Sequence, residues 1–331
     1  MGSHLWGWPC LEEDSLKRLR DFVVVLAVLA GVATADLAHA QGTGKSLDIQ
    51  PGGRQNGMGA AGVALPDDAT GVTWWNPAGL GFAERAAVEL TYAQLVPGLA
   101  SDVSYNYGTW VQPIGGWGAL GFNMIFLSYG NIDGTDAQGN STGQFGANEW
   151  APQLSYGTKI LPDLSVGATL KYVRLQLAPS NQRGVGSTFA VDVGGLYKIP
   201  VARLSFGANL QNVGPSVTFI NEDQASPLSR NLKLGVGWEA FNAKQFALTL
   251  ASDFNQSLVT NDFRVYNNGV ELRFAEQLAG RLGYYYDKLG DIRDMTYGLG
   301  VNWHNLSLDF ASIPQAKGLE NVEKITLGYR F

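Results

Sequence analysis

The chain has 331 residues, of which 11 % are aromatic and 42 are glycine, and its formal net charge is −6. This mild acidity argues against a nucleic-acid partner, which would require a basic face. After residue 40 no segment approaches the roughly 18 consecutive apolar residues of a membrane-spanning helix, which excludes a helical membrane protein.

Residues 1–40 have the three parts of a secretory signal. A basic patch ends at Arg20, the apolar run Phe22–Ala35 comes next, and Ala38-His39-Ala40 gives a small-x-small cleavage pattern. The apolar run is shorter than the roughly 20 residues that cross a bilayer. We therefore expect cleavage after Ala40, which leaves a mature chain with a net charge of −4 because residues 1–40 carry three basic and five acidic side chains.

Residues 41–84 are rich in glycine and alanine and show no alternation. Pro66-Asp67-Asp68-Ala69-Thr70 predicts a helix start with carboxylates at its positive end. In Trp75-Asn76-Pro77-Ala78-Gly79, a proline followed two residues later by a glycine indicates a helix end or a turn. We interpret 41–84 as a compact insert that packs inside or beneath the sheet formed by the rest of the chain.

From Arg85 onward the chain repeats about ten alternating residues and then a break. In residues 164–172 the even positions are apolar, whereas the odd positions carry Ser, Gly, Thr and Lys. Residues 232–238 and 295–303 repeat this pattern, and a period of two is typical of strands with two unlike faces. The predicted strands are 85–96, 102–113, 116–128, 149–160, 164–177, 187–198, 204–213, 231–240, 246–255, 263–274, 278–287, 295–303, 306–314 and 323–331.

The breaks between these segments alternate between short and long. Breaks such as 161–163 and 304–305 have five residues or fewer, whereas 129–148 and 214–230 are long and polar. An even number of strands with this asymmetry is typical of an outer-membrane barrel with short periplasmic turns and long outer loops. The sequence thus predicts an all-β membrane protein, a 14-stranded antiparallel transmembrane barrel over 85–331, with a small N-terminal lumenal or periplasmic segment.

The physics of lipid sets the two faces of this barrel. Every backbone amide must be paired, so the sheet closes and its apolar face looks into the bilayer, while polar residues and a few charges fill the lumen. Aromatic residues near strand ends fit interfacial girdles, namely Trp110, Trp117, Trp150, Trp238 and Tyr284–Tyr286. On the last strand Tyr329 and Phe331 share the outward face, in a register that resembles the signal read by the outer-membrane assembly machinery.

Motifs of catalysis and cofactor binding are weak. Gly57–Gly62 matches GxGxxG, but no strand precedes it and no βαβ unit surrounds it, so we interpret the match as accidental. Cleavage would remove Cys10, the single cysteine, and leave only His304 of three histidines. His304 lies in a predicted two-residue turn. Asp291 and Asp294 on an outer loop leave a barrel enzyme as a minor alternative; otherwise we expect no catalytic residue, metal or cofactor.

Three blocks support a family resemblance. Ala60–Thr70, followed by Trp75–Leu80, resembles the N-terminal signature of the PorV/PorQ family, which belongs to the FadL-like barrels. Phe206–Pro215, with Leu228–Gly235 after it, resembles that family's stretch in which Asn-hydrophobic-Gly-Pro precedes Asn-Leu-hydrophobic-Leu-Gly. The third block is Arg281–Tyr286 followed by Tyr297–Gly300 and Leu308–Phe310. FadL-like barrels have fourteen strands, in agreement with the count from alternation.

The resemblance implies two functions. PorV-like proteins are non-enzymatic accessories of type IX secretion that receive secreted cargo from a translocon, whereas FadL-like proteins are channels for hydrophobic small molecules. Asn76, Pro77 and Gly79 belong to a motif shared by both groups and do not discriminate. The block that ends at Pro215 and the shorter chain favour the secretion accessory.

Residues 212–230 are the expected contact with a protein partner. Gly214-Pro215 sets the turn out of the strand, because proline holds its own φ and the preceding glycine tolerates the backbone conformation that a proline imposes. Glu222 and Asp223 would present acceptors at the rim, where basic groups of a cargo or translocon protein can meet them. With Asn212, these residues are the partner-binding candidates.

Overall fold

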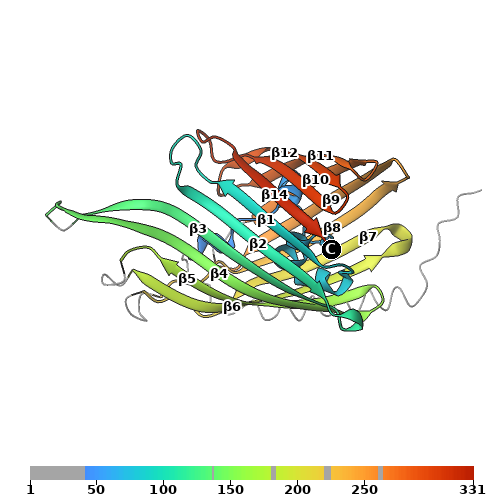
Figure 1. The fold of residues 1–331 in the computed structure, drawn as a ribbon, viewed down its shortest axis with the longest axis horizontal. Helices are drawn as coiled ribbons and strands as arrows, with labels where there is room; N and C mark the ends of the chain where they lie inside the picture. Colours follow the sequence, from blue (N-terminus) through green and yellow to red (C-terminus); the bar gives the residue numbers. More distant parts are fainter. Residues whose placement is uncertain (1–41, 136–137, 180–183, 220–224, 260–263) are drawn as a thin grey trace, which may run out of the picture. The chain divides into compact units, whose positions relative to one another are not determined.

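Fourteen antiparallel strands close into one barrel in the computed structural model, which describes residues 42–331 except 136–137, 180–183, 220–224 and 260–263 (Figure 1). Each strand pairs with its neighbours in the chain, and β1 pairs with β14 to close the ring. The strands are β1 (Ala87–Gln94), β2 (Val103–Pro113), β3 (Ala119–Thr135), β4 (Ser141–Leu161), β5 (Leu164–Gln176), β6 (Val185–Ile199), β7 (Leu204–Val213), β8 (Asn231–Asn242), β9 (Phe246–Ser257), β10 (Arg264–Phe274), β11 (Leu278–Asp287), β12 (Ile292–Trp303), β13 (Leu306–Ile313) and β14 (Val322–Arg330).

The alternation predicted from the sequence is confirmed on strands such as β5 and β12. On β5, Leu170 is 53 % exposed on the outer wall, whereas its neighbour Lys171 is fully buried in the lumen. On β12, Leu299 is exposed and Thr296 is buried. In these parts of the strands the outer wall is apolar and the inner face polar, as a bilayer requires of a closed sheet. Toward the long-loop end of β5 the inward residues Val173 and Leu175 are apolar instead and belong to a buried apolar cluster.

The two ends of the barrel differ as the break lengths predicted. One end has tight turns such as 162–163 and 304–305, and the other carries the long connections such as 214–230. His304 adopts a left-handed φ of 55° in its turn, which agrees with its interpretation as a turn residue. Short turns mark the periplasmic end in bacterial barrels, so we place the long-loop end outside the cell.

The predicted loop 129–148 is mostly strand, and this prediction is wrong. β3 continues to Thr135 and β4 begins at Ser141, so the two strands form a hairpin that runs past the others at the long-loop end (Figure 1). Apart from Ile132 and Phe145, the described residues of 131–135 and 141–146 are polar or glycine. The alternation that reveals the membrane part is therefore missing.

The orientation can be tested with single cysteines. Ser141, at the far end of the hairpin, and Asn305, in a tight turn, are both exposed and lie at opposite ends of the barrel. We expect Ser141→Cys to react with a membrane-impermeant thiol reagent on whole cells and Asn305→Cys to react only after the outer membrane is permeabilised. Equal labelling of both on whole cells would contradict the orientation.

Aromatic residues gather at the tight-turn end of the outer wall. Trp117 and Trp303 are 77 % and 65 % exposed there, as expected of an interfacial girdle. The run Tyr284–Tyr286 is only partly a girdle, because strand geometry turns Tyr285 inward, where it packs against the apolar core. Phe331 follows β14, and its N–H donates to the Ala86 carbonyl at 2.9 Å.

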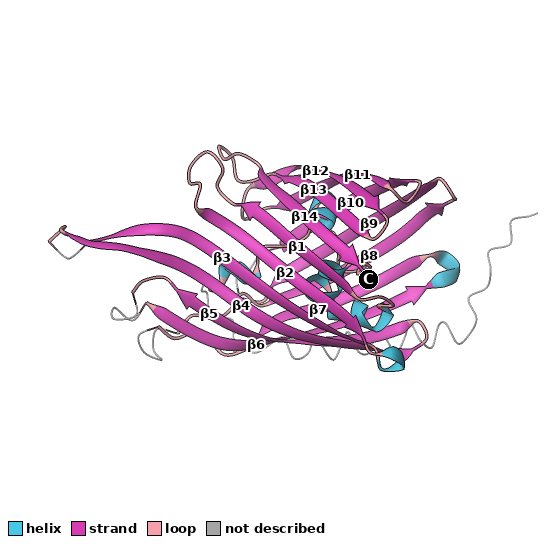
Figure 2. Ribbon diagram, in the orientation of Figure 1, coloured by secondary structure: helices cyan, strands magenta, loops and turns pink. Residues whose placement is uncertain are grey.

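The residues before β1 form short helical turns on the lumenal side of the wall (Figure 2). They are η1 (Lys45–Leu47), α2 (Gly53–Gly57), η2 (Gly71–Trp75) and η3 (Pro77–Phe82), while η4 (Gly115–Trp117) and η6 (Pro200–Ala202) lie in tight turns. Among the described residues no helix is long and apolar enough to cross a bilayer. The predicted signal at 1–40 lies outside the described residues.

Candidate functional site

The predicted helix start at Asp68 is present. Asp68 Oδ1 accepts from the Gly71 N–H at 2.6 Å, and Glu89 of β1 accepts from the N–H groups of Ala69 and Thr70 at 3.2 and 2.9 Å. Carboxylates thus receive the free amides of the first turn, as the helix dipole favours. Burial raises the pKa of the Asp68 carboxyl above its usual range, although the nearby Arg54 guanidinium opposes that rise.

Asn76 joins the inserted segment to the wall. Its Oδ1 accepts from the Ala78 N–H at 3.1 Å, while its Nδ2 donates to the carbonyls of Val63 and Gly195, both at 3.0 Å. Asn76 is fully buried, and Pro77 begins η3 in the first helical position, where its missing N–H costs nothing. The motif that begins at Asn76 and Pro77 therefore attaches the inserted segment to the barrel wall.

A row of glycines on the barrel wall contacts Asn76 and Pro77. Gly157, Gly167 and Gly194 lie opposite one another on β4, β5 and β6 and face the lumen. A Cβ on Gly157 or Gly167 would overlap the Pro77 carbonyl oxygen, and one on Gly194 would overlap Asn76 Oδ1. The backbone of the insert can approach the wall this closely only because three strands carry no side chain there.

Close backbone contact between the insert and the wall also explains the glycines of the GxGxxG match. Gly59 has φ 70°, and a Cβ there would overlap the Asn268 carbonyl oxygen of β10. A Cβ on Gly283 of β11 would in turn overlap the Gly59 nitrogen. These glycines serve close contact between the insert and the wall.

Two tryptophans occupy the middle of the lumen. Trp74 and Trp75 are each 1 % exposed and stack edge to face at 4.9 Å. Their carbonyls accept from Gln211 Nε2 at 2.8 Å and Asn209 Nδ2 at 2.9 Å, and Lys233 Nζ lies 4.2 Å from the Trp74 ring. Polar groups of the wall therefore hold the insert in place, and the insert fills the lumen between them.

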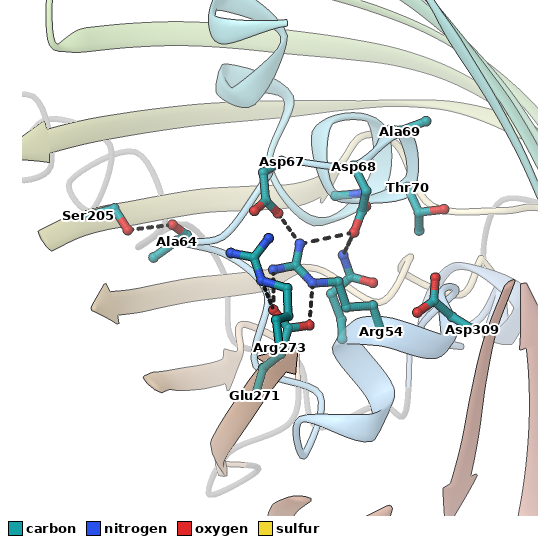
Figure 3. A network of polar contacts seen from close by, with 12 residues as sticks. Arg54, Ala64, Asp67, Asp68, Ala69, Thr70, Ser205, Glu271, Arg273 and Asp309 are labelled. Carbon is teal, nitrogen blue, oxygen red and sulfur yellow. Dashed lines mark hydrogen bonds and ion pairs between the residues drawn. The ribbon is translucent and has the colours of Figure 1, made fainter. Parts of the chain in front are cut away.

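A network of charged side chains links the other side of the insert to the barrel wall (Figure 3). Arg54 of α2 donates to both carboxylate oxygens of Glu271 at 2.9 and 3.0 Å, contacts Asp67, and lies 3.5 Å from Asp68. Arg281 donates to the same Glu271 at 2.7 Å and to Asp309 at 2.6 Å.

These charges were not among the residues expected to form a site. A signal existed, because Glu271, Arg281 and Lys171 occupy lumen-facing positions of strands, where a charge requires a partner. Which charges would meet depends on strand neighbours and on the insert, and alternation specifies neither.

The predicted partner-binding residues divide into three groups. Asn212 is fully buried: its Oδ1 accepts from Lys171 Nζ at 2.8 Å, its N–H donates to Asp192 at 2.8 Å, and its Nδ2 donates to the Ser229 carbonyl at 2.7 Å. Gly214 is half-buried and Pro215 is exposed at the base of the outer connection. Glu222 and Asp223 lie outside the described residues.

The assembly-signal candidates lie where the sequence placed them. Tyr329 and Phe331 are 41 % and 65 % exposed, and their rings meet edge to face at 4.9 Å. That the outer-membrane assembly machinery recognises these two residues stays a proposal.

Three cavities flank the insert. At the long-loop end a cavity of about 190 Å³ is lined by apolar residues such as Ile49, Leu95 and Ile313 and by the polar residues Asp48, Gln50, Asn56 and Lys324. At the tight-turn end cavities of about 370 and 330 Å³ lie on the two sides of Pro66 and Asp67.

Solved structures of similar fold include two toluene transporters and a FadL homologue. The Ralstonia pickettii toluene transporter TbuX has 16 % identity and a TM-score of 0.59, and the match covers 85 % of this chain and 98 % of TbuX. The Pseudomonas putida toluene transporter TodX has 14 % identity and a TM-score of 0.56, with 85 % and 98 % covered. A Pseudomonas aeruginosa FadL homologue has 13 % identity and a TM-score of 0.51, with 86 % and 99 % covered. At such identities the likeness shows the fold alone.

Sequence comparison supplies the family. No curated protein matches the chain. The family model described as "Type IX secretion system protein PorV" matches residues 39–263, which is more than half of the chain. This outer-membrane β-barrel with a FadL-like fold therefore belongs to the PorV family of type IX secretion system proteins.

Proposed function

We propose that the protein is a non-enzymatic accessory of type IX-type secretion that binds secreted cargo or translocon proteins at its outer rim. The PorV family match supports this role. The filled lumen also supports it, because Trp74, Trp75 and the Arg54 network occupy the space that a wide pore would need. The exposed rim at the long-loop end then remains as the surface for large partners.

The β3–β4 hairpin is the observation that carries this proposal. β2 pairs with β3 only as far as Tyr129, and β5 pairs with β4 only from Asn148. Within the described residues, 131–135 and 141–146 therefore pair as strands only with each other. The outer edges of this ribbon carry no neighbouring strand, although the Asn131 N–H donates to Asp102 Oδ2 at 3.0 Å. An open edge offers backbone donors and acceptors to a partner strand.

The ribbon also carries an apolar contact. Ile132, 40 % exposed, lies opposite Phe145 on the neighbouring strand. Asp133 is the only charged side chain among the described residues of 131–135 and 141–146. Open edges, one apolar pair and little charge are features of a surface that accepts another chain.

The second outer element is the connection 214–230, which is held at its base. Thr43 pairs with Leu228, its N–H donating to the Pro227 carbonyl at 2.8 Å, and Asp48 accepts from Ser229 at 2.5 Å. Asn212 would act in partner binding by holding this base. Gly214, Pro215, Glu222 and Asp223 would stand at the rim as the contact candidates.

The test is the double substitution Ile132→Ser with Phe145→Ser. We expect the barrel to remain folded, because this part of the hairpin lies outside the bilayer, while co-purification of secretion partners falls by about tenfold, as loss of a central apolar contact predicts. Quantitative mass spectrometry after mild-detergent extraction measures it. The control is Leu99→Ser, which removes a 74 % exposed leucine from another outer loop. Equal partner recovery from both variants would refute the hairpin as the contact.

A hydrophobic-solute channel is the second candidate function. The 190 Å³ cavity at the outer end favours it, since a mostly apolar wall with a few polar groups suits a small hydrophobic molecule. Under this alternative, filling the cavity by Ile313→Trp lowers uptake of a hydrophobic solute, and the hairpin substitutions leave uptake unchanged. The secretion role is supported if Ile313→Trp leaves uptake unchanged and the hairpin substitutions reduce partner recovery.

A further inference from the structure

We infer that the 370 Å³ cavity at the tight-turn end, with Arg85, Lys198 and Arg330 on its wall, binds an acidic peptide segment offered from the periplasm. This site lies at the opposite end of the barrel from the proposed cargo surface. It adds a periplasmic partner, and its test is independent of the outer hairpin.

The cavity lies where the insert leaves the barrel. Its walls are residues 66–69 and 82–85 of the insert and the adjoining ends of β1, β2, β6 and β14. The neighbouring 330 Å³ cavity shares Pro66, Asp67 and Lys198 with it and extends along β6 to β10. The two cavities therefore give adjoining subsites, which suit an extended chain better than a compact small molecule.

The charged side chains of this cavity that have no ion-pair partner among the described residues are mainly cations. Within the part of the chain that the structure describes, Arg85, Lys198 and Arg330 have no carboxylate within 4.0 Å. Lys198 instead lies 4.2 Å from the Phe82 ring, and Arg330 reaches only the Asp67 carbonyl, at 3.5 Å. These cations are in place to receive acidic groups from another chain.

The acids at the same cavity are mostly committed elsewhere. Asp67 and Asp68 pair with Arg54, and Asp68 also accepts from Gln55 Nε2 at 2.8 Å. Glu84 is exposed and, among the described residues, has no basic group within 4.0 Å. The wall carries three acids and three cations, but two of the acids already pair with Arg54. Within the described part of the chain, three unpaired cations therefore face one unpaired acid, which favours an anionic occupant.

The apolar part of the wall distinguishes a peptide from a simple anion. Val72, Phe82 and Val111 line the cavity together with the charged groups. Carboxylates of an acidic peptide would meet the cations, and its apolar side chains would cover these residues. Inorganic phosphate would use only the charges.

The experiment uses the full mature barrel in nanodiscs, where both ends are accessible. The probe is a fluorescent peptide of about eight residues with alternating Glu and Val, which extends to about 26 Å at roughly 3.3 Å per residue. We expect saturable binding that weakens with salt, and weaker binding of the matching Lys and Val peptide. The double variant Lys198→Gln, Arg330→Gln should bind the acidic peptide about tenfold more weakly.

Lys244→Gln is the matched control, because Lys244 is exposed in another tight turn and lines neither cavity. Arg85→Gln provides a second variant if the double variant folds poorly, which heat modifiability on a gel reports. Three results would each overturn the inference. They are equal binding of the acidic and basic peptides, equal affinity of the cavity variants and the Lys244 variant, and complete displacement of the peptide by millimolar inorganic phosphate.

Discussion

Replacing Gly167 by valine is expected to dislodge the N-terminal insert and to destabilise the barrel by about 3 kcal/mol or more. A Cβ at this position would overlap the Pro77 carbonyl oxygen and lie 2.6 Å from the Ala78 nitrogen. Both are backbone atoms in the middle of the lumen, so no flexible side chain can move aside. We expect a large fall in the temperature at which the purified protein loses its heat-modifiable form.

The control for this substitution is Gly280→Val on β11. Gly280 is an exposed strand glycine, and a Cβ there would meet no atom within 4 Å. The intrinsic strand preference for valine is the same at both positions, so the difference isolates contact with the insert. Limited proteolysis of residues 42–84 gives an independent measurement, since a displaced insert is cleaved faster. Equal stability and equal cleavage of the two variants would show that Pro77 does not rest on this wall.

Removing the carboxylate of Glu271 is expected to have the second largest effect. Glu271 is fully buried, accepts from both Arg54 and Arg281, and has Arg273 3.4 Å away. The substitution Glu271→Ala leaves two arginines of low exposure without their shared partner. Breaking a buried pair in this way costs about 3 to 5 kcal/mol, because the remaining charge stays poorly solvated.

Glu239→Ala provides the comparison within the same cluster. Glu239 is 31 % exposed and lies 3.9 Å from both Arg203 and Arg273. Exposed pairs at this distance contribute less than about 1 kcal/mol. Denaturant unfolding of both variants in detergent measures the difference. A cost for Glu271→Ala no larger than that for Glu239→Ala would mean that the Arg54 network does not fasten the insert.

The membrane-embedded strands could be predicted from the sequence because lipid imposes a strict condition on every second residue. Outward positions such as Leu170 on β5 and Leu299 on β12 are apolar, and the predicted ends of these strands lie within three residues of the observed ends. The same condition explains the failure at 129–148. Outside the bilayer both faces of the β3–β4 hairpin meet water, so its pairing depends on the partner strand and leaves no periodic mark.

The candidate site was only partly predictable for a related reason. The motif from Asn76 to Gly79 could be recognised in the sequence as a helix end or a turn. Its role in attaching the insert depends on Gly195 and on a row of glycines about 80 residues or more away in the chain. Asn212 was expected among the residues that contact a protein partner, and it is buried between Lys171, Asp192 and Ser229. Its left-handed φ of 62° turns it inward at the end of β7, and strand alternation does not predict such a reversal.

The sequence by itself therefore determined the closed fourteen-stranded barrel, its apolar outer wall and the difference between its two ends. These result from local periodicity and from the need to pair every backbone amide in lipid. Only the tertiary structure decided how the lumen is filled, which buried charges meet, and where cations gather around a cavity. Those contacts join residues that are distant in the chain, and each depends on the exact fit of the insert between several strands. No local pattern encodes that fit.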